Sequence, residues 1–157
     1  MRIRFTKAKR PGKPDVLTCV RDDGSSTWMH ERPGFVWHDL VHYAVETTLG
    51  YRVGFFGLVA SGWELQAFGH DPATGERLAL PGVPEAPVES VVSLFQQERA
   101  GLIAPADFRA ALALSCPAVA PTLTDERRAA VRRRIEELFG RWHAVPPGEV
   151  LELPFAV

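Results

Sequence analysis

The chain has 157 residues, of which 46% are hydrophobic and 24% charged, and its formal net charge is −1. This composition is typical of a folded globular protein and excludes wholesale disorder, and the length favours a single domain over residues 1–157. The near-neutral charge argues against a polycation that coats nucleic acid, and no run of 18 apolar residues predicts a membrane-spanning helix. Two cysteines and a first segment without the apolar core of a secretory signal favour a soluble protein of the reducing cytoplasm.

The two ends of the chain predict an antiparallel sheet. Residues 2–6 alternate between polar and apolar side chains, which is the period of a half-buried strand. Residues 16–20 are rich in β-branched side chains, and the turn signal DDGS at residues 22–25 separates them from a returning strand over residues 26–31. Residues 150–155 predict a last strand that can return to the same sheet.

Helical patterns dominate the rest of the chain. Pro33-Gly34 ends the predicted sheet, and apolar residues then recur at helical spacing. A turn is expected at residues 70–75 and a proline-rich connection at residues 81–87. The predicted helices cover residues 36–49, a buried segment at 54–68, residues 88–100, a short helix near Pro105, and a long helix from its cap at Thr124 to the stop at Pro146. The sequence therefore predicts an α+β fold, a small antiparallel sheet packed against four or five helices.

One polar row lies on the first predicted helix. His38 and His42 are four residues apart, so their imidazoles project from the same side of a helix and can reach one metal ion. Glu46 extends the row by another turn and is the predicted third ligand. Two imidazoles and a carboxylate suit zinc or iron better than calcium. Asp39 and Glu46 are the candidate catalytic carboxylates, which would move a proton while the metal polarises a substrate or activates water.

Three family motifs resemble parts of this row. Residues His38 to His42 are similar to the zinc-protease pattern in which two histidines flank a glutamate, with Asp39 in the place of that glutamate. The same five residues resemble the His-Asp-x-x-His motif of the ubiquinone-biosynthesis proteins, whose last glutamate corresponds to Gly54. The pair His38-Asp39 also resembles the His-Asp pair of metal-dependent phosphohydrolases, without their earlier histidine and later aspartate. Each resemblance covers about five residues, and none assigns the chain to a family.

Other interpretations of the row stay open. The two histidines can lie at a half-exposed helix boundary without a ligand, or serve as a metal-free acid and base. His30, Glu64, His70 and His143 are more distant candidate ligands, among which the sequence does not choose. At the level of function, a small metal-dependent hydrolase or lyase stands beside a non-enzymatic accessory or protein-interaction domain.

The basic residues offer no strong sign of a nucleic-acid interface. Six cations precede the first acid of the chain, which favours a solvated strand face and loop over a binding arm, although an acidic partner stays open. In the long helix near the C-terminus, glutamates alternate with the arginines, so we expect a surface with many salt bridges. Neither Cys19 nor Cys116 has a nearby base in the sequence or a partner at the spacing of metal ligands. The sequence also contains no phosphate-binding loop motif.

Overall fold

The computed structural model describes residues 1–68 and 87–157, so the turn predicted at 70–75 and residues 81–86 of the connection predicted at 81–87 lie outside the described residues. Its sheet is antiparallel and has the strand order β3-β2-β1-β4. The strands are β1 (Arg2–Thr6), β2 (Val16–Val20), β3 (Ser26–His30) and β4 (Val150–Pro154). The prediction that both ends of the chain form one sheet is confirmed.

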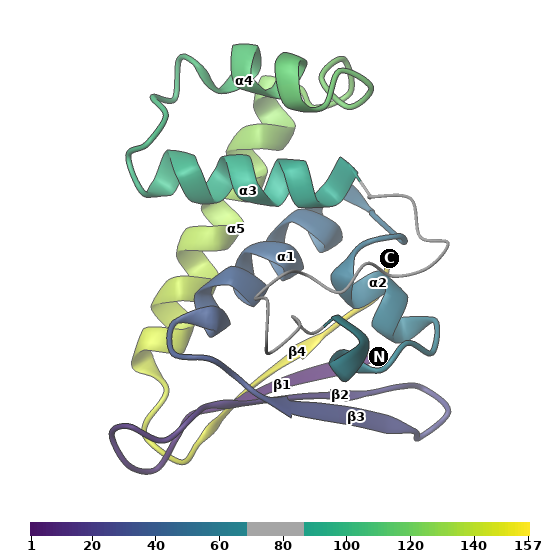
Figure 1. Ribbon diagram of the computed structural model, residues 1–157, viewed down its shortest axis with the longest axis vertical. Coiled ribbons are helices and arrows are strands. Elements are labelled where there is room, and N and C mark those ends of the chain that lie inside the picture. Colours follow the sequence, from purple (N-terminus) through teal and green to yellow (C-terminus); the bar gives the residue numbers. More distant parts are fainter. Residues whose placement is uncertain (69–86) are drawn as a thin grey trace, which may run out of the picture.

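Helices cover one face of this sheet (Figure 1). They are α1 (Phe35–Leu49), α2 (Phe55–Ala60), the 3-10 helix η1 (Leu65–Phe68), α3 (Pro87–Arg99), α4 (Phe108–Ser115) and α5 (Asp125–Ala144). Helix α1 lies in the middle, where it packs against α5, α3 and α2. The predicted α+β class is thereby confirmed. No helix in the described parts of the chain is long and apolar enough to cross a membrane.

The period-2 pattern of the strands divides the sheet into a buried and an open face. Ile3 of β1 lies opposite Cys19 and Leu153, and all three are fully buried under the helices. The alternate positions point away from the helices, and among them Trp28 of β3 is 53% exposed. Burial of the inner row is the main force that holds the helical layer on the sheet.

The segment predicted as one buried helix over residues 54–68 is two short helices, so that prediction was wrong in its continuity. Helix α2 ends at Ala60, and Gly62 adopts a left-handed φ of 111°, which side chains other than glycine rarely accept. Gly57 is required for packing, because a Cβ there would lie 2.2 Å from the backbone oxygen of Arg52. The glycines that lower helix propensity in this segment therefore give it its bend and its close contacts.

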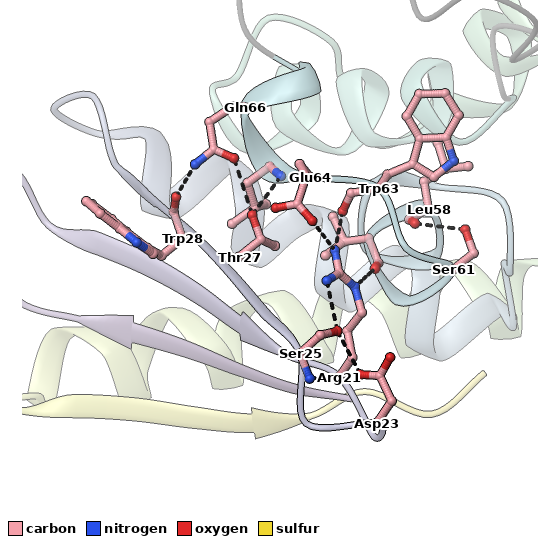
Figure 2. A network of polar contacts seen from close by, with 12 residues as sticks. Arg21, Asp23, Ser25, Thr27, Trp28, Leu58, Ser61, Trp63, Glu64 and Gln66 are labelled. Carbon is pink, nitrogen blue, oxygen red and sulfur yellow. Dashed lines mark hydrogen bonds and ion pairs between the residues drawn. The ribbon is translucent and has the colours of Figure 1, made fainter.

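A polar network fastens this bent segment to the hairpin of β2 and β3 (Figure 2). The guanidinium of Arg21 donates to the carbonyl oxygens of Val59 at 2.7 Å and Trp63 at 2.6 Å. On β3, the hydroxyl oxygen of Thr27 accepts a hydrogen bond from the backbone N–H of Leu65 at 3.1 Å. These bonds tie backbone groups at the end of α2, before η1 and at the start of η1 to the hairpin, and they hold one wall of the site described below.

Cations of the N-terminal segment have structural partners. The ammonium group of Lys7 donates to the carbonyl oxygens of Trp142 at 2.8 Å and Val145 at 2.7 Å, at the C-terminal end of α5. Arg4 forms an ion pair with Glu152 of the neighbouring strand. A lysine at a helix C-terminus satisfies carbonyls that have no partner within the helix. Part of the basic segment thus serves the fold.

Candidate metal centre

Helix α1 presents both histidines of the predicted row on one side. The helix begins after Gly34 and ends at Gly50, both with left-handed φ, and its 15 residues keep His38 and His42 one turn apart. Their Nε2 atoms lie 3.1 Å from each other. His42 is only 1% exposed, whereas His38 is half-buried. The predicted convergence of the two imidazoles is therefore present.

A glutamate from α3 completes the group. The carboxylate oxygen Oε2 of Glu89 lies 3.6 Å from Nε2 of His42. One ligand atom each from His38, His42 and Glu89 lie within 4.8 Å of one another. Glu89 occupies the first turn of α3, and the packing of α3 against α1 carries it to the histidines. Within the described parts of the chain, this is the group whose atoms are close enough to hold one metal ion.

Glu46, the ligand that the sequence predicts, lies on the other side of the His42 ring. Its carboxylate is fully buried and accepts hydrogen bonds from the backbone N–H groups of Phe56 at 3.3 Å and Gly57 at 2.9 Å. These are the unpaired amides of the first turn of α2, so Glu46 caps that helix from a distance. Its Oε1 atom also lies 3.4 Å from Nδ1 of His42. The carboxylate is thus placed to orient His42, while Nε2 faces His38 and Glu89.

His38 has a comparable partner on its outer nitrogen. The side-chain amide of Gln96, on α3, lies 2.5 Å from Nδ1 of His38. Each histidine therefore has a polar side chain near Nδ1, hydrogen-bonded in His38 and 3.4 Å away without a hydrogen bond in His42, and turns Nε2 toward the shared group. Hydrogen bonds at the nitrogen that does not bind the ion are typical of metal-binding histidines, because they select the tautomer and hold the ring.

A cavity of about 230 Å³ opens beside this group. Its walls combine the candidate ligands with acidic groups, one arginine and a set of large apolar side chains. The lining residues are Met29, Glu31, Arg32, Phe35, His38, Asp39, His42, Phe55, Phe68 and Glu89. The site is therefore a small, largely apolar hollow with a few convergent polar groups, which is the usual form of a ligand pocket.

Two buried carboxyl groups form part of this wall. Asp39, the candidate catalytic residue, is 5% exposed and Glu31 is 3% exposed. Burial is the main cause that raises the pKa of Glu31 to about 6, and it raises the pKa of Asp39 well above its ordinary value, with the Glu31 charge adding to the effect. Burial and the neighbouring Glu31 carboxyl thus favour the protonated form of Asp39.

The other candidate ligands that the structure describes lie elsewhere. The ring of His30 stacks edge to face on Trp28, and Glu64 pairs with Arg21. His143 is exposed near the end of α5, and His70 lies outside the described residues. Burial and the charge of Asp39 raise the pKa of the Cys19 thiol to about 12, so Cys19 is no nucleophile.

Comparison of the chain with protein-family models, with curated proteins and with solved structures gave no match.

Proposed function

We propose that this chain is a metal-dependent hydrolase or lyase that binds one zinc or iron(II) ion through His38, His42 and Glu89. The observation that carries the proposal is the convergence of their three ligand atoms within 4.8 Å at the side of a cavity. Ligand atoms about 2.1 Å from one ion lie roughly 3.0 to 3.4 Å apart when the angle between them is 90° to 109°. The Nε2–Nε2 separation of 3.1 Å and the His42–Glu89 separation of 3.6 Å are close to that range.

The donor set supports a catalytic ion over a purely structural one. Two imidazoles and one carboxylate leave coordination positions open, as in catalytic zinc sites and in non-haem iron sites, whereas structural zinc sites use four protein ligands. When bound, such an ion supplies Lewis acidity toward a substrate oxygen and lowers the pKa of water. Glu89 replaces Glu46 as ligand in this proposal, and Glu46 holds the His42 ring.

Asp39 is the group that moves a proton in the proposed reaction. It follows His38 directly on α1, lines the same cavity and lies beside Glu31. The zinc-protease motif carries a glutamate at this position, and the aspartate here is shorter by one methylene. Glu31 lines the same cavity and is a second carboxyl to which the proton can move.

Metal analysis tests the proposal directly. Protein purified without a histidine tag and dialysed against equimolar zinc or iron(II) should retain about one ion per chain by inductively coupled plasma mass spectrometry. His38→Ala and Glu89→Gln should lose the ion, and Glu46→Gln should weaken binding by about 10- to 100-fold. Glu126→Gln, at an exposed position of α5, is the control and should bind as the unchanged protein does. A folded protein that retains neither ion contradicts the proposal.

The second candidate is a non-enzymatic protein-interaction domain, and the open face of the sheet favours it. Trp28 is 53% exposed and Val150 is 47% exposed, at positions that alternate with the buried row. A large exposed aromatic side chain is a common anchor of protein interfaces. Absence of metal binding, together with loss of cellular function in Trp28→Ser but not in His38→Ala, would select this candidate.

A further inference from the structure

The charge, apolar side chains and volume of the cavity beside the candidate metal centre indicate which class of ligand it binds. We propose, resting on the proposed metal centre for the reaction but not for binding, that its substrate is a small molecule with an apolar or aromatic body and a carboxylate that Arg32 binds. The argument uses three observations: the surroundings of Arg32, the apolar walls, and the size of the cavity.

Arg32 is the cation of the cavity wall. It lies in the short connection between β3 and α1, where its carbonyl oxygen accepts a hydrogen bond from the backbone N–H of Phe35 at 2.9 Å. Its guanidinium lies over the Phe35 ring, 5.8 Å from the centroid, and has no carboxylate or carbonyl partner within the described parts of the chain. By contrast, the Arg21 guanidinium uses its donors on Val59, Trp63 and other groups. A guanidinium held against an aromatic ring with its donors unused is suited to a planar carboxylate.

The Phe35 ring joins this cation to the candidate metal centre. Its centroid lies 5.6 Å from the ring of His38, on the helix that carries both histidines. Phe35 is itself 37% exposed, which leaves part of the ring open to a ligand. A ligand that reaches from Arg32 to His38 therefore runs along an aromatic surface for about the width of one ring.

Apart from Arg32, the two histidines and the carboxyl groups of Glu31, Asp39 and Glu89, the rest of the lining is apolar. Phe55 packs edge to face on Phe68 with ring centroids 4.9 Å apart, and Met29 is the other apolar side chain of this part of the lining. The volume of about 230 Å³ is larger than the cavity of about 150 Å³ that takes benzene, and smaller than the usual pocket for drug-sized molecules. One aromatic ring or short aliphatic body with two substituents fits these dimensions. One substituent is the carboxylate at Arg32, and the other is the reacting group at the histidines.

Calorimetry with a matched pair of probes tests this inference. We would titrate 3-phenylpropionate and its neutral analogue 3-phenylpropionamide into the full chain in EDTA, so that no metal contributes. The carboxylate should bind about tenfold more tightly than the amide, which is the order expected for a hydrogen-bonded charge pair. Arg32→Gln should remove this tenfold preference and leave amide binding unchanged, and Arg32→Lys should keep part of it. Arg109→Gln is the control, because Arg109 is exposed and pairs with Asp125.

Each other outcome counts against the inference. Equal affinity for the two probes, or full carboxylate preference in Arg32→Gln, overturns the role of Arg32. Carboxylate binding that appears only after zinc is added and survives Arg32→Gln also overturns it, since the carboxylate would then bind the ion. Failure of the metal centre is a separate result, because it appears in the metal analysis and leaves the titrations in EDTA unaffected.

Discussion

Gly54→Ala probes the link between α2 and the candidate metal centre. Gly54 has φ −141° and ψ −170°, an extended conformation that alanine adopts freely. A Cβ at this position would nevertheless lie 2.5 Å from Cδ of Glu46 and 2.8 Å from both of its oxygens. Because Glu46 is fully buried and bonded to α2, the substitution forces its carboxylate to move.

The expected loss of stability follows from the contacts that this movement breaks. Ordinary contact begins at 3.4 Å, so the carboxylate must shift by about 1 Å, enough to lose its bonds to the N–H groups of Phe56 and Gly57. Hydrogen bonds to a charged group contribute about 1.5 to 3 kcal/mol each. Alanine recovers about 0.4 to 1 kcal/mol through the lower entropy of the unfolded chain. The free energy of unfolding should therefore fall by about 2 to 5 kcal/mol.

Urea denaturation of the metal-free protein, followed by circular dichroism, measures this loss. Gly140→Ala is the matched control, because a Cβ at that position of α5 meets no atom within 4 Å, so it should stabilise the fold by about 0.5 to 1 kcal/mol. In a Glu46→Ala background the clash is gone, and Gly54→Ala should cost almost nothing. Equal losses in both backgrounds would refute the argument, since the cost would then arise from the backbone and not from the carboxylate.

Three further predictions concern single side chains. Glu31→Gln should stabilise the fold by about 1 kcal/mol at pH 7 and not at all below about pH 4.5. The raised folded-state pKa of Glu31, about 6, contributes stability at low pH that is lost as the pH rises through that value. Urea denaturation of both proteins across this pH range measures the difference. Lys7→Met should lower the unfolding free energy by about 1 to 3 kcal/mol and Lys13→Met by less than about 0.5, since only Lys7 caps α5; equal thermal shifts would contradict this. Gln96→Glu should tighten zinc binding about tenfold and Gln96→Leu weaken it, whereas Gln97→Leu should leave it unchanged; calorimetry with zinc that ranks them otherwise removes Gln96 from the site.

Local patterns were sufficient to predict most of the fold. The alternation in residues 2–6 and the turn signal at 22–25 each depend on neighbouring residues alone, and β1, β2 and β3 follow them closely. Thr124 accepts the cap bond from the N–H of Arg127 as predicted. The buried segment at 54–68 was harder, because its apolar residues fit a helix while its break depends on the left-handed Gly62.

The site was only half accessible to sequence reasoning. The spacing of His38 and His42 on one helix can be read directly from the sequence. Glu89, by contrast, reaches them only through the packing of α3 on α1. The same holds for Glu31, which lies beside Asp39 because the end of β3 passes the start of α1. The sequence held one indication for Glu89. It is the second residue of the predicted helix 88–100 and follows Val88 of the buried face, which places its acidic side chain close to the core.

The position of the ring hydrogen on His38 and on His42 bears on whether the pair can bind an ion. With no ion, two neutral imidazoles whose Nε2 atoms are 3.1 Å apart share one hydrogen between those atoms, so the ring that donates has a bare Nδ1. An ion needs both Nε2 lone pairs, and both Nδ1 atoms must then donate outward. The Glu46 carboxylate lies 3.4 Å from Nδ1 of His42 as a potential acceptor, and the Gln96 amide can turn its oxygen toward Nδ1 of His38. The outer partners of the pair thus admit the tautomers that an ion requires, at a cost of one amide rotation, and this makes the row on α1 better suited to binding a metal than a bare pair of helical histidines.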